Sequence, residues 1–174
     1  MAKAELLAPI IFGWEGGWAN DPNDKGGKTN MGITLATWKS CGYDKDGDGD
    51  IDAADLKLIT KKDVFGVLKK YYWDRWKADE IVNQSVANLL VDWVWASGKW
   101  GIIKPQEILH CVVDGVVGEK TIYALNSADQ SWLFKQIWLA RLSFINEICK
   151  NDPSQLKFKK GWINRLNSFK FSQK

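Results

Sequence analysis

Residues 15–34 read EGGWANDPNDKGGKTNMGIT and place a single glutamate beside two glycines and a tryptophan. The preceding apolar residues recur at helical spacing, which predicts a buried amphipathic helix, kinked at Pro9, from Leu6, Leu7, Ile10, Ile11 and Trp14. We expect a carboxyl group at the end of this helix, between two tryptophans, to be partly desolvated and close to the helix's negative end. Both effects favour the protonated form that a general acid needs. The alternative is a surface glutamate before a helix-ending glycine pair.

The residues that follow Glu15 are rich in turn formers. Residues 20–24 read NDPND, in which Asn and Asp side chains bond to their own backbone, and Gly26 and Gly27 permit positive backbone angles. The stretch 29–34, TNMGIT, interleaves polar and small residues, which indicates a short hairpin lining a pocket. We therefore expect a glutamate at a helix end, then a polar loop, then a hairpin.

This block resembles glycoside hydrolase family 108, phage and bacterial N-acetylmuramidases of which some are named secretion activators. The matching elements are Glu15-Gly16-Gly17-Trp18, Asn20-Asp21-Pro22, Gly26-Gly27, Thr29-Asn30 and Gly32-Ile33-Thr34. The resemblance implies a mainly α, lysozyme-like helical fold with at most a small β-hairpin. It also implies a peptidoglycan hydrolase of the endolysin type, whose general acid is Glu15 and whose partners are glycan strands.

The resemblance also suggests the remaining site residues. Asp24 is the expected second catalytic group by analogy with phage-type lysozymes, with Asp21 as a rival, while Thr29 or Thr34 positions water. Whether the reaction inverts or retains configuration stays open. The candidates for substrate contact are Trp18, Asn20, Asn30 and Trp73; Trp14 and Trp76 are further candidates for sugar stacking. Most of the eleven tryptophans are nevertheless expected in the core.

A second resemblance lies in the C-terminal half. Residues 114–121, DGVVGEKT, are similar to the DGxxGxxT signature of small peptidoglycan-binding modules, and DWVWASG (92–98) and GWINR (161–165) match the family's C-terminal region. The similarity implies that Asp114 contributes to wall binding. An ordinary turn before a helix is the alternative interpretation.

An independent motif predicts a calcium site. Aspartates occupy positions one, three, five, seven, nine and twelve of an EF-hand-like loop, with glycine at six: Asp44, Asp46, Asp48, Asp50, Asp52 and Asp55. The loop carries a net charge of −5, which leaves +8 for the rest of a chain whose total is +3. Because calcium sensors pair two such loops, a structural ion is expected rather than a switch. The alternative is a solvated acidic turn.

The length of 174 residues suits one domain or two small lobes, which we expect at 1–80 and 81–174. Further expected helices are residues 34–41, the helix opened by Thr60 and continued to Trp76, and residues 83–97, 105–112, 119–126, 131–150 and 153–169. Three widely spaced cysteines suit reduced thiols, and His110 suits a helical, non-catalytic position. A Cys–His dyad has no supporting motif.

The N-terminus shows neither a signal peptide nor a membrane span, so synthesis in the bacterial cytoplasm is expected. A wall hydrolase made there needs a holin or another export route. No motif indicates nucleic-acid binding. Three function classes therefore remain: a muramidase, a non-catalytic peptidoglycan-binding or secretion-promoting protein, and a calcium-dependent interaction protein.

Overall fold

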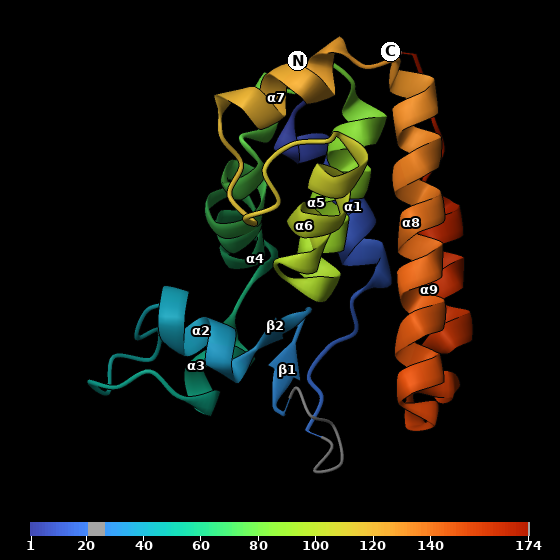
Figure 1. Ribbon diagram of the computed structural model, residues 1–174. Helices are drawn as coiled ribbons and strands as arrows, with labels where there is room; N and C mark the ends of the chain where they lie inside the picture. The colour runs from blue at the N-terminus through green and yellow to red at the C-terminus, as the bar shows by residue number, and fades with distance from the viewer. Residues whose placement is uncertain (21–26, 174) are drawn as a thin grey trace. The chain divides into compact units, whose positions relative to one another are not determined.

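The computed structural model describes residues 1–20 and 27–173. Within these ranges the chain is mainly helical, with one two-stranded antiparallel sheet (Figure 1). It divides into two compact units: residues 5–71, called the N-terminal unit here, and residues 1–4 with 72–174, called the C-terminal unit. The lobe boundary expected after residue 80 falls nine residues after this division. No helix in the described part of the chain is long and apolar enough to cross a bilayer.

The N-terminal unit contains the hairpin and four α-helices, the first of which begins at the boundary. In chain order the elements are α1 (Ala4–Trp14), β1 (Thr29–Asn30), β2 (Ile33–Thr34), α2 (Leu35–Cys41), α3 (Ala53–Leu58), α4 (Lys61–Leu68) and the π-helix η1 (Lys69–Trp73), which crosses the second boundary. Thr34 caps α2 with its hydroxyl and Gly42 ends that helix, as expected. Capping boxes start both α3 and α4.

The buried face of α1 differs from the expected one. Leu7 and Ile11 are fully buried, whereas Leu6 is 56% exposed and Trp14 40%. The difference arises because Ala4 and Ala8 share the buried face with Leu7 and Ile11, at positions i, i+3, i+4 and i+7. Counting small alanines as core residues rotates the face away from Leu6.

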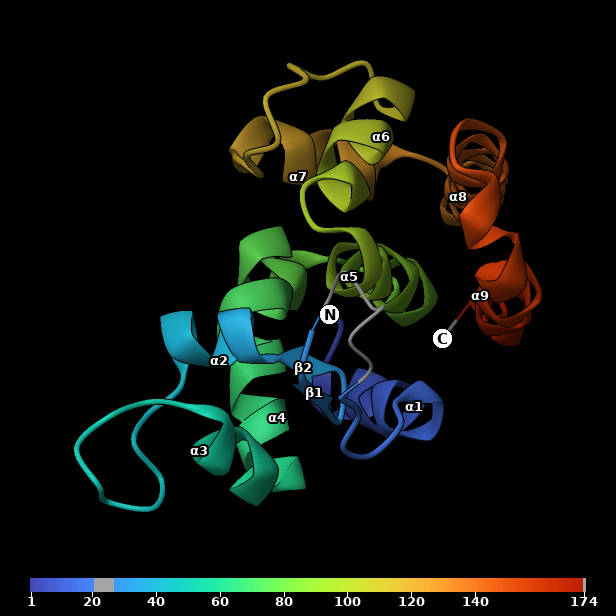
Figure 2. The ribbon, with the colours of Figure 1, turned by 90° about the horizontal axis from the view of Figure 1, so that it is seen from below.

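The C-terminal unit is a helical assembly around α5. Its elements are the 3₁₀ helices η2 (Asp74–Trp76) and η3 (Ala78–Glu80), then α5 (Gln84–Ser97), α6 (Trp100–Ile108), α7 (Glu119–Ser127), α8 (Gln130–Asn151), η4 (Pro153–Gln155) and α9 (Leu156–Ser168). Every residue from 85 to 94 is buried, because α5 packs on both α6 and α8. Helices α8 and α9 lie side by side in both views (Figures 1 and 2).

A buried charged cluster joins three of these helices. The carboxylate of Asp92 on α5 accepts from Arg141 on α8 at 2.7 Å and from Arg165 on α9 at 2.7 Å. Asp92 is fully buried and Arg141 is 4% exposed. Removing the carboxylate would leave the buried guanidinium group of Arg141 without the counter-charge of Asp92.

The helix expected at residues 105–112 is α6, which spans Trp100–Ile108 instead. It begins at Trp100, directly after the turn at Gly98, and contains Pro105 in its interior. Proline lacks the N–H that would bond to Gly101, and the indole of Trp76 donates to the Gly101 carbonyl instead, at 3.2 Å. Trp76 therefore has a structural partner that accounts for its full burial.

The same helix ends earlier than expected because His110 adopts a left-handed conformation, with φ of 53°. The N–H of Cys111 donates to Gln106 and that of His110 to Glu107, which is the hydrogen-bond pattern of a Schellman motif. His110 thus lies in a helix-terminating turn instead of on a helix. The sequence does not indicate that α6 ends here, because glycine is the usual residue at this position of a Schellman motif.

Candidate active site

The candidate acid, Glu15, is the first residue after α1. Its N–H donates to the Ile11 carbonyl at 3.1 Å, so it continues the last helical turn, and the residue is half-buried. Four residues later, Ala19 and Thr29 exchange two backbone hydrogen bonds of 2.8 and 2.9 Å. This bridge returns the chain to the hairpin, so that the hairpin lies beside the end of α1.

The hairpin turn brings a backbone atom against the acid. Met31 and Gly32 both have positive φ, 49° and 82°, as in a two-residue type I′ turn. A Cβ atom built on Gly32 would lie 2.6 Å from both Cδ and Oε2 of Glu15. Glycine is therefore required twice at this position, once for the turn and once for the space that the carboxyl group occupies.

Asn30 fixes the hairpin to α3. It is 7% exposed, and its Nδ2 donates to the carbonyls of Leu56 at 2.8 Å and Lys57 at 3.3 Å. These carbonyls belong to the last turn of α3, where helical acceptors lack partners in their own helix. Because its amide nitrogen already donates to α3, we interpret Asn30 as a residue that positions the hairpin.

The two expected threonines differ in their surroundings. Thr29 donates its hydroxyl to the Gly27 carbonyl at 3.0 Å. The hydroxyl of Thr34 accepts from the N–H of Thr37 at 3.1 Å as the cap of α2 and lies 3.0 Å from the Thr37 hydroxyl. The hydroxyl of Thr34 is thereby committed to starting a helix. Asp24 and its rival Asp21 lie outside the described residues.

The predicted substrate contacts separate into exposed and buried residues. Asn20 is exposed, and Trp18 is 37% exposed with the Lys57 ammonium 4.9 Å from its ring centroid. Trp73 is fully buried, and its indole donates to Asp79 at 2.7 Å. A ring without an exposed face cannot stack on a sugar, so we leave Trp73 out of the proposed binding residues.

The acidic loop 44–55 forms two groups of carboxylates. One oxygen from each of Asp44, Asp46 and Asp48 lies within 4.8 Å of the others, and the same holds for Asp50, Asp52 and Asp55. Partial burial, followed by neighbouring aspartates, raises the pKa of Asp46, and the charge of Asp48 above all raises the pKa of Asp50. A bound cation would relieve this repulsion.

Asp55 connects the loop to α3. Its carboxylate accepts from the N–H groups of Asp52 at 2.7 Å, Lys45 at 2.6 Å and Asp46 at 3.2 Å, and these hydrogen bonds lower its pKa. The bond to Asp52 belongs to the capping box of α3. Contacts thus lead from the acidic loop through α3 and Asn30 to the turn that touches Glu15. Sequence reasoning did not find this path, since no local pattern reports it.

Asp114 stabilises the loop that borders a second candidate site. Its carboxylate accepts from Val116 N–H at 2.8 Å and from the amide of the fully buried Gln106 at 3.0 Å, and these bonds lower its pKa. The same Gln106 amide accepts from Gly115 N–H at 2.9 Å. The loop borders a hollow of about 550 Å³ lined by His110, Cys111, Val112, Asp114, Val116, Gly118, Glu119, Lys120 and Thr121. Asp114 shapes this hollow, and Gln106 was missed by sequence inspection.

Comparison with known proteins identifies two family regions and a similar solved structure. Residues 8–98 match the profile of glycosyl hydrolase 108, and residues 101–167 match that of a predicted peptidoglycan domain. A solved structure of Brucella abortus SagA is similar to this chain with 28% identity and a TM-score of 0.80, over 95% of this chain and 90% of SagA. No match is found among curated protein sequences.

Proposed function

Because the chain belongs to the glycosyl hydrolase 108 family, we propose that it is an N-acetylmuramidase that cleaves the β-1,4 bond between N-acetylmuramic acid and N-acetylglucosamine in peptidoglycan. The observation that carries this proposal is the position of Glu15, half-buried and in contact with a hairpin turn inside the matched region. A carboxylic acid held at a fixed place is what protonation of a glycosidic oxygen requires.

In the proposed reaction Glu15 gives its proton to the oxygen that leaves with N-acetylglucosamine. The bond between this oxygen and C1 of the muramic acid breaks, and C1 gains oxocarbenium character. A second group then either stabilises this charge or takes a proton from the water that adds to C1. Asp24 remains the sequence candidate for that group, and Thr29 and Thr34 remain the candidates to orient water, although their hydroxyls already bond to the Gly27 carbonyl and cap α2.

Purified sacculi test the catalytic part of the proposal. The wild-type protein should release new reducing ends, and mass analysis should find fragments ending in N-acetylmuramic acid. Glu15→Gln should lower the rate by roughly 10²- to 10⁴-fold, the usual contribution of a general acid, without changing thermal unfolding. Glu5→Gln is the matched control, because Glu5 is an exposed glutamate on the same helix. Undiminished hydrolysis by Glu15→Gln would exclude this acid.

A non-catalytic wall-binding role is the second candidate, favoured by the match of residues 101–167 to a predicted peptidoglycan domain. We propose that the hollow beside Asp114 contacts peptidoglycan in either case. Sedimentation with sacculi separates the two roles. Binding without new reducing ends from the wild-type protein supports the second role and rejects the first.

We also propose that residues 44–55 bind one structural calcium ion. The spacing of the six aspartates supports this proposal, because calcium takes six to eight oxygen ligands. The aspartates also form two clusters of three, and within each cluster the carboxylate oxygens lie within 4.8 Å of one another. Asp44, Asp46, Asp48, Asp50, Asp52 and Asp55 are the candidate ligands. The ion would reduce the net charge of the loop from −5 to −3 and stabilise α3, on which Asn30 depends.

A further inference from the structure

The positive charge of this protein is concentrated at its C-terminus. Residues 150–174 contain seven lysines and arginines and one aspartate, a net charge of +6. Since the whole chain carries +3, residues 1–149 sum to −3. The function proposed above assigns no role to this segment, most of which is helix α9.

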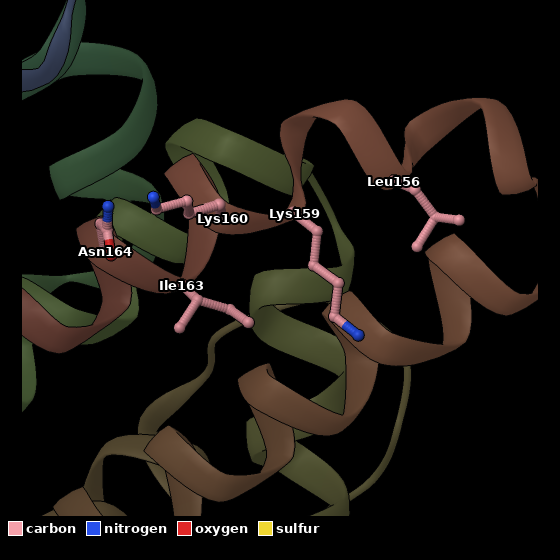
Figure 3. Close-up of a pocket in the computed structure, with 5 residues that line it drawn as sticks. All are labelled: Leu156, Lys159, Lys160, Ile163 and Asn164. Atoms are coloured by element: carbon pink, nitrogen blue, oxygen red, sulfur yellow. The ribbon is translucent and has the colours of Figure 1, made fainter.

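A shallow groove lies along α9. It has a volume of about 360 Å³ and is lined by Leu156, Lys159, Lys160, Ile163 and Asn164, none of them acidic. Figure 3 shows Leu156, Lys159 and Ile163 projecting to the same side of the helix. Leu156 is 54% exposed. The groove therefore combines an apolar floor with two ammonium groups.

A further exposed aromatic group lies on α9 outside the groove, because positions i and i+2 do not share a side of a helix. Phe158 is 44% exposed and stacks on Trp162 with ring centroids 5.8 Å apart, while the Lys157 ammonium lies 4.8 Å from the Phe158 ring. On the side of the groove, by contrast, Leu156 and Ile163 are flanked by Lys159 and Lys160. Apolar side chains on one face, with lysines beside them, are typical of helices that lie in the interface of a bilayer.

This combination distinguishes between anionic partners. A phosphate-rich polymer or a nucleic acid would pair with the ammonium groups but would leave Leu156 and Ile163 uncovered. The surface of an anionic phospholipid bilayer offers phosphate groups to the lysines and a shallow apolar boundary to the other two side chains. We propose that the first two turns of α9 dock on an anionic phospholipid bilayer.

Vesicle flotation with the full-length protein tests the proposal. The protein should float with phosphatidylglycerol-containing vesicles and not with pure phosphatidylcholine vesicles. Replacing Lys157, Lys159 and Lys160 with Gln should reduce the partition coefficient by roughly 100-fold, given the usual contribution of a lysine near an anionic surface. The matched control replaces Lys39, Lys62 and Lys135, three exposed lysines elsewhere, and should retain binding at the same net charge.

Leu156→Ser with Ile163→Ser separates a bilayer from a polyanion. This double variant should lose vesicle binding while it keeps the wild-type affinity for soluble polyphosphate. Equal vesicle binding by the double variant and the wild type would overturn the proposal in favour of a polyanion partner, and failure of the wild type to float would overturn it outright. Hydrolysis of lipid-free sacculi should be unchanged in all these variants, so failure of this proposal is distinguishable from failure of the enzymatic one.

Discussion

The carboxyl group of Glu15 packs against the α-carbon of Gly32, seventeen positions away in the sequence. A Cβ atom on Gly32 would approach Cδ and Oε2 of Glu15 to 2.6 Å, a separation that real side chains do not adopt. The turn at Gly32 therefore determines where the proposed proton donor can lie.

Gly32→Ala should accordingly reduce hydrolysis of sacculi by about 100-fold or more, because a displacement of about 1 Å in a catalytic group has effects of that size. The positive φ of residue 32 also makes any side chain strained, which should cost about 1–2 kcal/mol of stability.

Gly27→Ala is the control for that strain. Gly27 also has a positive φ, 66°, but a Cβ atom there meets no neighbour within 4 Å. It should show a similar loss of stability with activity largely retained. If both variants lose activity equally, backbone strain and not displacement of Glu15 explains the loss.

We expect Asn30 to support the site by stabilising the folded protein. Asn30→Ala leaves the Leu56 and Lys57 carbonyls without their donor and should lower the free energy of unfolding by about 1–3 kcal/mol. Asn30→Asp should be worse, since its carboxylate would face two carbonyl oxygens. Urea unfolding measures both, and the exposed Asn20→Ala serves as control. A neutral Asn30→Ala variant would contradict the anchoring role.

Calcium should raise the melting temperature by about 5 °C or more when present at 100 times its dissociation constant. A chelator should reverse the gain, and magnesium should not replace calcium because it prefers smaller octahedral sites. Asp48→Asn with Asp50→Asn should remove the response and slightly stabilise the calcium-free protein, because Asp48 and Asp50 repel each other. A melting temperature independent of calcium would reject the metal site.

The local features of this fold follow from local sequence. Thr34 and Gly42 bound α2, the Thr60 and Asp63 pair starts α4, and the TNMGIT segment forms the hairpin, each through contacts within a few residues. Caps and tight turns depend on short-range geometry, so the sequence predicts them well. The family resemblance, in turn, rests on such short motifs and is confirmed by the match over residues 8–98.

The remaining features depend on partners distant in sequence. Residues 69–73 form a π-helix and residues 74–76 a 3₁₀ helix instead of continuing α4. The sequence does not distinguish these helix types, because Trp73 and Trp76 could be buried in any of them. Likewise, the Gly101 carbonyl tolerates Pro105 because Trp76, 25 residues away, donates to it. Neither the Asn30 anchor nor the Gly32 contact has a local signal beyond the residue type.

Asp63 should make stability depend on pH. Burial favours a raised pKa, but hydrogen bonds from Thr60, Lys45 and Tyr43 outweigh it and hold the pKa of Asp63 well below its ordinary range. A depressed folded-state pKa gives stability that is present above the unfolded-state value, about 3.9, and is lost as pH falls below it. Asp63→Asn should therefore flatten the fall in melting temperature below about pH 4, while the exposed Glu147→Gln should not. An unchanged acid slope in Asp63→Asn would contradict this assignment.

The cluster of Asp92, Arg141 and Arg165 should be the most sensitive electrostatic feature of the C-terminal unit. Burial lowers the pKa of Arg141, and the charge of Asp92 opposes that shift, so the carboxylate keeps the guanidinium charged inside the protein. Asp92→Asn should lower the free energy of unfolding by about 3–5 kcal/mol, because breaking a buried pair leaves an uncompensated charge. Glu107→Gln breaks the exposed Lys104–Glu107 pair and should cost at most about 1 kcal/mol. Chemical denaturation of both variants compares the two sites directly, and equal losses would show that the buried cluster has no special role in joining α5, α8 and α9.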